Sequence, residues 1–208
     1  MRLFVLGATG RTGVELVDLG LARGHDVTAF VRSPRRITRA DARLHVHEGD
    51  PLDASQMAAA LAGHDAVLSA LGPTPGEAMA ATTLLQSAAA STLAAMAAAH
   101  VRRFLVVSSA LLFPGGGLGP GFFRWLIRNH LRDAGAMEAA VEASAVDWTI
   151  ARPPRLVATR DEGYRAQDGA LPDGLTLRAK LSWRAVAAFL LDAVDDARYV
   201  RKVVGIRA

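Results

Sequence analysis

Gly7-Ala8-Thr9-Gly10-Arg11-Thr12-Gly13 is the stretch that decides the fold, because of what stands on either side of it. Before it, Arg2–Leu6 has the composition of a short apolar strand, and after it Val14–Ala22 has the apolar spacing of a helix that packs on one face. Glycines also occur in ordinary turns. Between a strand and a helix, however, this pattern indicates a turn that binds a dinucleotide.

The three glycines are expected to do different things in such a turn. Gly7 permits the tight turn, Gly10 lets the backbone approach a pyrophosphate, and Gly13 allows the helix to pack closely on the strand. The start of the helix adds free N–H groups and the positive end of the helix dipole, which both favour phosphate. The alternative interpretation is a turn with a structural role only.

Strands and helices are expected to alternate along the rest of the chain. We expect further strands over Asp26–Val31, Leu44–His47, Ala66–Ala70, Arg103–Val107, Trp148–Ala151 and Tyr199–Ile206. We expect further helices over Asp53–Leu61, the alanine-rich Met79–Ala99, Phe122–Val141, and from the N-cap Ser182 to about Ala193. Short strands and a substrate loop are equally compatible with Arg155–Ala179. The pattern predicts one α/β domain over residues 1–208, a Rossmann fold with a doubly wound, mostly parallel sheet and helices on both faces.

The end of the second strand indicates which dinucleotide binds. Enzymes that use NAD usually place an acid there, whereas an arginine accommodates the 2′-phosphate of NADP. The stretch Arg32-Ser33-Pro34-Arg35-Arg36 has no acid before Asp41. Arg32 and one of Arg35 or Arg36 are expected to clamp a dianionic phosphate, with Ser33 as a further donor. The alternative is a solvated run of charge. NADP(H) is therefore favoured over NAD(H).

Three other strand ends meet the same edge of the predicted sheet, where ligands bind in open α/β folds. After the third strand, Gly49-Asp50-Pro51 places Asp50 either near the adenine or at the start of a helix. Leu71-Gly72 closes the fourth strand. Ser108-Ser109 closes the fifth strand and leaves a hydroxyl beside the expected nicotinamide.

Together these stretches resemble an atypical short-chain dehydrogenase/reductase of the NAD(P)H-binding, NmrA-like group, with most likeness to flavin reductase and biliverdin-IXβ reductase proteins. The resemblance rests on Phe4–Gly13, Val27–Arg36, Gly49-Asp50, Asp65–Gly72, Ser108–Phe113 and Trp148–Pro154, in the same order. It implies that Thr9 to Thr12, with Arg11 between them, hold the pyrophosphate and that Arg32 and Arg36 hold the 2′-phosphate. It also implies that Ser109 and Pro153-Pro154-Arg155 flank the nicotinamide and the substrate.

The acid that most short-chain dehydrogenases use is missing. They rely on Tyr-x-x-x-Lys, in which the lysine lowers the pKa of the tyrosine. Four residues after Tyr164 and Tyr199, the only tyrosines, stand Asp168 and Val203. Hydride transfer to a free flavin, a quinone or a tetrapyrrole needs no such acid, because water can supply the proton. We therefore expect an NADPH-dependent reductase of a planar conjugated acceptor. The alternative is a catalytically silent NADP(H) sensor of the NmrA-like kind that acts through a protein partner.

Several side chains are candidates for the substrate site or for other chemistry. The aromatic residues around a Pro/Gly-rich loop are Phe113, Phe122, Phe123 and Trp125; core packing is the default interpretation for them, and contact with a planar substrate is the alternative. Phe113 and Trp125, with Arg155, are the substrate candidates, and Ser109 is expected to orient the nicotinamide or the acceptor. His45 and His47 have no third ligand nearby, so we expect no metal site. The interpretations for the rest are solvent exposure or capping for Asp133 and Glu138, and packing for Trp183.

The composition sets broad limits on partners. The chain has 208 residues, 51% hydrophobic and 21% charged, with no cysteine, and its net charge of +4 comes from scattered arginines. Scattered arginines do not indicate a nucleic-acid surface. The longest apolar stretch is broken by Ser, Thr and Gln, and the N-terminal apolar run is too short for a signal peptide. We expect a cytoplasmic protein without a membrane or nucleic-acid partner, as a monomer or weak dimer.

Overall fold

The computed structural model describes residues 1–73 and 80–208. Its principal sheet has the strand order β3-β2-β1-β4-β5-β6-β10-β8, and all pairs are parallel except β10 with β8. A separate parallel pair joins β7 to β9. The strands are β1 (Arg2–Leu6), β2 (Asp26–Val31), β3 (Leu44–Glu48), β4 (Ala66–Ser69), β5 (Arg103–Val107), β6 (Asp147–Arg152), β7 (Arg155–Val157), β8 (Arg165–Asp168), β9 (Lys180–Ser182) and β10 (Lys202–Arg207).

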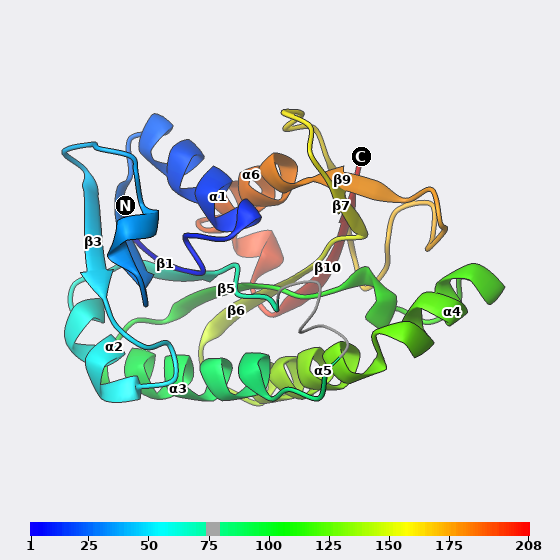
Figure 1. Ribbon diagram of the computed structural model, residues 1–208, viewed down its shortest axis with the longest axis horizontal. Coiled ribbons are helices and arrows are strands. Elements are labelled where there is room, and N and C mark those ends of the chain that lie inside the picture. The colour runs from blue at the N-terminus through cyan, green and yellow to red at the C-terminus, as the bar shows by residue number, and fades with distance from the viewer. Residues whose placement is uncertain (74–79) are drawn as a thin grey trace.

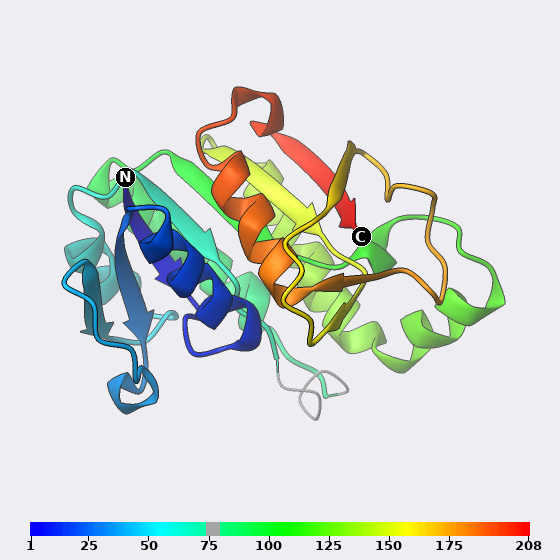
Figure 2. The ribbon, with the colours of Figure 1, turned by 90° about the horizontal axis from the view of Figure 1, so that it is seen from above.

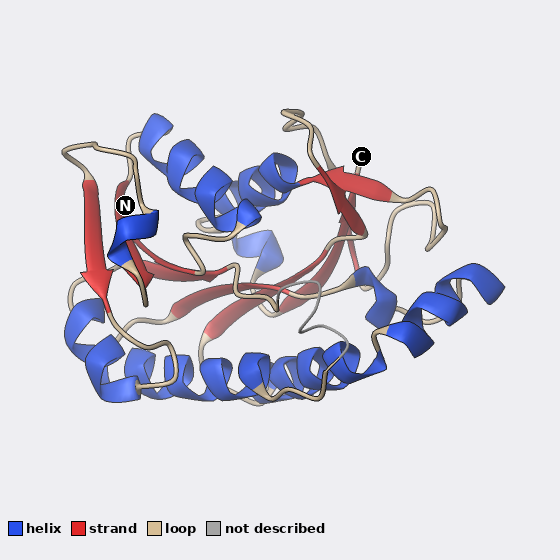
Figure 3. Ribbon diagram, viewed as in Figure 1, coloured by secondary structure: helices blue, strands red, loops and turns tan. Residues whose placement is uncertain are grey.

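Helices cover both faces of the sheet (Figures 1 and 3). The α-helices are α1 (Arg11–Ala22), α2 (Ala54–Leu61), α3 (Leu84–Ala99), α4 (Leu118–Leu126), α5 (Arg128–Glu142) and α6 (Trp183–Ala193). Helices α1 and α6 lie side by side over one face, as Figure 2 shows, and α2, α3 and α5 line the other. This three-layer arrangement confirms the predicted doubly wound, mostly parallel Rossmann fold.

The alternation of side chains along β1 explains why both faces are covered. Leu3 and Val5 pack into the cluster under α1 and α6, whereas Phe4 and Leu6 pack into the cluster under α2, α3 and α5. Successive side chains of a strand point to opposite faces, so an all-apolar strand must be buried on both sides. The short apolar strand therefore becomes a central strand of the sheet.

Three predicted boundaries are wrong. The alanine-rich helix expected over Met79–Ala99 begins at Leu84, since residues 80–83 are not helical and Met79 lies outside the described residues. The helix expected over Phe122–Val141 is two helices, because Ile127 between them leaves helical geometry with φ −107° and ψ 29°. The last strand begins at Lys202 and not at Tyr199, which lies in a short 3-10 turn capped by Asp196. In the stretch with two open interpretations, short strands and long loops both occur, and the predicted N-cap Ser182 accepts from the Ala185 N–H at 2.8 Å.

The interpretation of Asp133 and Glu138 as solvent-exposed is also wrong, since both are buried on α5. Capping does hold for Asp133: its carboxylate accepts from the N–H groups of Leu85 and Gln86 in the first turn of α3. Glu138 instead pairs with Arg152 at the end of β6, with oxygen–nitrogen distances of 3.0 and 2.5 Å. Both carboxylates hold α5 against its neighbours through these hydrogen bonds, so their role is structural.

A half-buried histidine makes stability depend on pH. His64 Nδ1 lies 3.1 Å from the Leu61 carbonyl oxygen, and its Nε2 lies 2.8 Å from Thr28 Oγ1. Burial lowers the pKa of His64 below its ordinary value of 6.5. Between the two pKa values the unfolded chain therefore binds more protons than the folded chain. The stabilisation is fully present above the unfolded pKa and is lost as the pH falls through the folded pKa.

We expect the free energy of unfolding to fall as the pH is lowered from neutral to mildly acidic values. Urea unfolding at a series of pH values measures this. His64→Gln is expected to flatten the dependence, whereas His45→Gln, at an exposed position on β3, serves as the matched control. A His64→Gln variant with the same pH slope as the native chain would contradict this account.

Candidate functional site

The glycine turn has the geometry that the sequence predicts. Gly7 adopts φ +78°, a conformation that side-chain-bearing residues rarely take, and its carbonyl accepts from the Gly10 N–H at 2.9 Å. A Cβ on Gly13 would lie 2.0 Å from the Gly7 oxygen, so only glycine lets α1 approach the turn this closely. The turn therefore holds the start of α1 against the end of β1.

The first turn of α1 is open to an anion. Its N-cap is Gly10, which offers no side chain to the free N–H groups, and the turn contains no acidic residue. The orphan N–H groups and the positive end of the dipole thus remain for a ligand. Thr12 and Gly13 are buried in this turn, while Arg11 is exposed and places its guanidinium 4.8 Å from the centre of the Trp183 ring.

A cavity of about 530 Å³, here called the glycine-loop cleft, opens beside this turn. It lies at the carboxyl ends of β1, β2 and β4, where the strand order reverses and ligands bind in this class of sheet. Its lining includes eight of the residues predicted for the cofactor: Gly7, Thr9, Gly10, Arg32, Arg36, Pro51, Leu71 and Gly72. The structure thus brings together side chains from four separate strand ends.

One corner of the cleft is strongly basic. Thr9, Arg32, Ser33 and Arg36 line an adjoining cavity of about 240 Å³, and none of these described lining residues carries a carboxylate. The Arg36 Nη2 donates to the Thr9 carbonyl oxygen at 3.4 Å, which ties the arginine to the glycine turn. Arg35 lines neither cavity. Of the two arginines that the sequence left as alternatives, Arg36 is the one beside Arg32.

Asp50 lies next to the cleft without lining it. Its carboxylate accepts from the Leu52 N–H at 3.0 Å, and the helix that follows is capped instead by Asp53. The helix-start role for Asp50 is therefore wrong, and its position near the adenine stays a prediction. The side chain closes the turn that presents Pro51 to the cleft.

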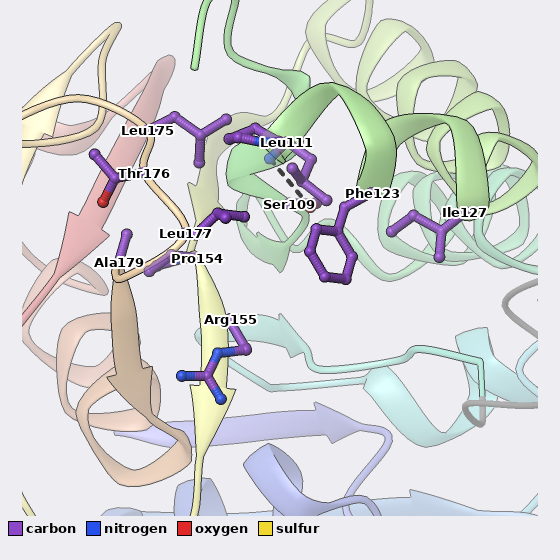
Figure 4. A pocket seen from close by; sticks show the side chains of 11 residues that line it. Ser109, Leu111, Phe123, Ile127, Pro154, Arg155, Leu175, Thr176, Leu177 and Ala179 are labelled. Carbon is purple, nitrogen blue, oxygen red and sulfur yellow. Dashed lines mark hydrogen bonds between the residues drawn. The ribbon is translucent and has the colours of Figure 1, made fainter. Parts of the chain in front are cut away.

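A second cavity of about 520 Å³, here called the apolar pocket, lies at the ends of β5 and β6 (Figure 4). Because β5 is the neighbour of β4, this pocket and the glycine-loop cleft share one edge of the sheet. The lining is mostly apolar and consists of Ser109, Leu111, Pro120, Phe123, Ile127, Pro154, Arg155, Leu175, Thr176, Leu177 and Ala179. Among these described lining residues, Arg155 alone has an ionisable side chain.

Ser109 presents its hydroxyl at the wall of the apolar pocket. It is the N-cap of the short 3-10 turn Ala110–Leu112, and its Oγ accepts from the Leu111 N–H at 3.3 Å. That bond uses a lone pair and leaves the hydroxyl proton to be donated. The neighbouring Ser108 Oγ is buried without a hydrogen-bond partner among the described residues.

The structure places the predicted substrate aromatics elsewhere. Phe113 is buried beneath the Arg152 guanidinium, 4.6 Å from its ring centre, and Trp125 is 61% exposed on α4. The ring in the pocket wall is that of Phe123. Pro154 and Arg155 do line the pocket, while Pro153 is buried behind it and its carbonyl accepts from the Ala110 N–H.

Apart from Phe123, sequence reasoning missed the part of the pocket wall that comes from α4 and from the loop before β9. The available signal was a pair of leucines, Leu175 and Leu177, in an otherwise polar stretch. Both tyrosines lie outside the two cavities: Tyr164 donates to Asp192 at 2.6 Å, and burial raises its pKa. Within residues 1–73 and 80–208, no three His, Cys, Asp or Glu side chains are grouped to hold a metal ion.

Comparison with known proteins decides the family. The family model described as NAD(P)H-binding matches residues 7–197, which is nearly the whole chain. The chain belongs to this NAD(P)H-binding family. Both ends of the match fit the structure, because it begins at the first glycine of the turn and ends after α6.

Relatives of this NAD(P)H-binding protein support the fold. The oxidoreductase ylbE from Lactococcus lactis shares 20% identity, with a TM-score of 0.83 over 99% of this chain and 90% of that one. A short-chain dehydrogenase/reductase from Veillonella parvula, solved in complex with NADP, shares 21% identity with a TM-score of 0.77 over 99% and 93%. YwnB from Bacillus subtilis is 31% identical over 77 residues, which are 37% of this chain and only 34% of YwnB.

Proposed function

We propose that this protein is an NADPH-dependent reductase that transfers a hydride to a flat, conjugated, largely apolar acceptor, such as a free flavin, a quinone or a linear tetrapyrrole. The observation that carries the proposal is the adjacency of two cavities at one sheet edge. One has a glycine turn and a basic corner, and the other has apolar walls. Apolar clefts with a few placed polar groups are typical of sites for small organic ligands.

The residues present fit NADP(H). Among the described residues other than its two chain neighbours, no side chain lies within 4 Å of a Cβ added at Gly10, and a helix start without acids faces this space. Arg32, Ser33 and Arg36 supply the donors that a 2′-phosphate requires. The NADP complex of the Veillonella parvula protein supports this choice for a related fold. When bound, NADPH would supply the hydride.

The protein's own contribution is to position the acceptor and exclude water. Phe123 offers a ring face, and Leu111 and Leu177 supply apolar walls that would displace water from a planar molecule. Arg155 at the rim suits an anionic substituent of the acceptor. The Ser109 hydroxyl is placed to donate to a carbonyl or ring nitrogen of the acceptor. Neither tyrosine is near enough to act as an acid, so the proton comes from water.

The experiment is NADPH oxidation, followed by nicotinamide absorbance, with FMN as the acceptor. Turnover that saturates with FMN supports the proposal. Tight NADPH binding without turnover of FMN, a soluble quinone or biliverdin would overturn it and favour the sensor that acts through a protein partner.

Ser109→Ala is expected to lower kcat of flavin reduction by several-fold to about tenfold, since an orienting hydrogen bond is worth about 0.5–1.5 kcal/mol. The affinity for NADPH is expected to stay nearly unchanged. Loss of a true proton donor costs roughly 10²–10⁴-fold. Steady-state kinetics with NADPH and FMN distinguish the two roles, and a thousand-fold drop in kcat, on that scale, would assign Ser109 an acid role that this account denies.

A further inference from the structure

Helix α4 carries apolar side chains that the rest of the molecule does not cover. Leu118 is 96% exposed, Phe122 58% and Trp125 61%, and Phe123 and Leu177 beside them are also exposed. These five residues are here called the aromatic patch. Pro120 is the only buried residue of α4, which projects beyond the end of α5 (Figure 1). Contiguous apolar surface of this kind marks a site of interaction.

The structure holds α4 in this outward position. Glycines at 117, 119 and 121 and Pro120 make the helix intrinsically weak, and its start has no side-chain cap. Arg124 compensates: its guanidinium donates to the carbonyl oxygens of Leu111, Gly115 and Phe113 at 2.8, 2.6 and 2.5 Å. The polar side of α4 is thereby fastened to the body of the protein, and the aromatic patch is left to face outward.

A set of cations, here called the basic rim, flanks the aromatic patch in the chain: Arg128 follows α4 and lies over the Trp125 ring, and Arg178 follows Leu177. The sequence has no Asp or Glu between 109 and 132 or between 174 and 180. The exposed cations Arg128, Arg132, Arg178 and Lys180 lie in these segments, and none forms a salt bridge with a carboxylate of the described residues. The rim therefore keeps its positive charge free for an external anion.

We propose that the aromatic patch and its basic rim attach the protein peripherally to an anionic lipid bilayer. Aromatic and leucine side chains on one side and arginines around them are the pattern of helices that lie in the membrane interface. A second copy of the chain is disfavoured, since a two-fold interface would bring this patch against itself and oppose arginine to arginine without an acid between them.

Attachment to the surface of a bilayer does not require a helix that crosses it. None of the helices formed by residues 1–73 and 80–208 combines the length and apolar composition that a bilayer crossing requires. The composition led to the expectation of no membrane partner, and this proposal departs from that expectation, because a surface contact needs only a few inserted side chains. Phe123 and Leu177 belong both to the patch and to the apolar pocket, so the mouth of the pocket would face the lipid. This surface role goes beyond the proposed reductase activity.

The test is co-sedimentation of the full chain, without cofactor or acceptor, with phosphatidylcholine vesicles that contain or lack phosphatidylglycerol. We expect binding to the anionic vesicles at least roughly tenfold stronger than to neutral ones, because each cation near the surface adds to the attraction. Raised salt should weaken it. Trp125 fluorescence should shift to shorter wavelength on binding, since Trp148 is already buried and Trp183 is half-buried against Arg11.

Matched variants locate the contact. Phe122→Ser with Trp125→Ser removes two exposed rings and is expected to weaken anionic-vesicle binding by roughly tenfold or more. Val46→Ser with Leu52→Ser removes two apolar side chains of similar exposure elsewhere and is expected to leave it unchanged. Three results overturn the proposal: no binding to anionic vesicles, equal loss in both double variants, or a dimer by sedimentation that Phe122→Ser with Trp125→Ser dissociates. Because no turnover is measured, failure here is independent of the reductase proposal.

Discussion

Gly10→Val is expected to abolish dinucleotide binding in a chain that still folds. Position 10 has φ −81° and ψ 168°, extended backbone that valine adopts readily, and an added Cβ meets only the Gly7 oxygen at 3.2 Å. The Gly7 oxygen would have to move by only a few tenths of an ångström to accommodate this Cβ. The branched side chain would instead occupy the space that a pyrophosphate needs in front of the first turn of α1.

Gly13→Ala supplies the contrast. Here an added Cβ would lie 2.0 Å from the Gly7 oxygen and 2.8 Å from the Ala8 Cα, both backbone atoms that cannot rotate away. We expect a loss of about 3 kcal/mol in unfolding free energy, at the upper end of what overpacking costs. Urea unfolding and calorimetric titration with NADPH measure the two effects. A folded Gly10→Val variant that binds NADPH normally would reduce the glycine pattern to a structural turn.

The sequence predicts well those features of the structure that are determined by residues close together in the chain. The glycine turn, the apolar run Leu3–Leu6 of β1 and the N-cap Ser182 each follow from residues adjacent in the chain, and each appears in the structure. The order of the first two strands also predicts an arginine near the glycine turn, although the choice of Arg36 over Arg35 needs the structure.

What the sequence does not reveal depends on contacts between distant segments. The break at Ile127 arises where Arg124 fastens α4 to carbonyl groups 9 to 13 residues upstream, while α5 packs on α3. Helical periodicity alone predicts one continuous amphipathic helix across α4 and α5. Of the aromatic residues around the loop, the structure places Phe123 in the pocket wall, whereas Phe113 is buried under Arg152 and Trp125 is exposed on α4. Burial of Asp133 likewise requires knowing that α3 begins beside it.

Replacing both Arg32 and Arg36 by alanine is expected to weaken NADP(H) binding by roughly 100-fold or more. Each charge-assisted contact with the phosphate contributes at least about 1.5 kcal/mol, and two such contacts would be lost. The affinity for NAD(H) should stay nearly the same, because NAD lacks the phosphate that these guanidinium groups would face. The preference for NADP(H), which the basic corner predicts for the native chain, would then disappear. Neither side chain forms a salt bridge with a carboxylate of the described residues, so the double variant should remain folded.

Arg35→Ala is the matched control. Arg35 lies on the same 3-10 turn as Arg36, is exposed, and lines neither cavity at the glycine turn. It removes one positive charge from the same segment and is expected to leave the NADP(H) preference intact, apart from a small long-range effect that salt screens. Calorimetric titrations of the native chain, the double variant and Arg35→Ala with NADP and NAD at two salt concentrations distinguish a direct contact with the phosphate from long-range electrostatic attraction. If the native chain bound both dinucleotides with equal affinity, or if Arg35→Ala cost as much as the double variant, the basic corner would not be a 2′-phosphate site.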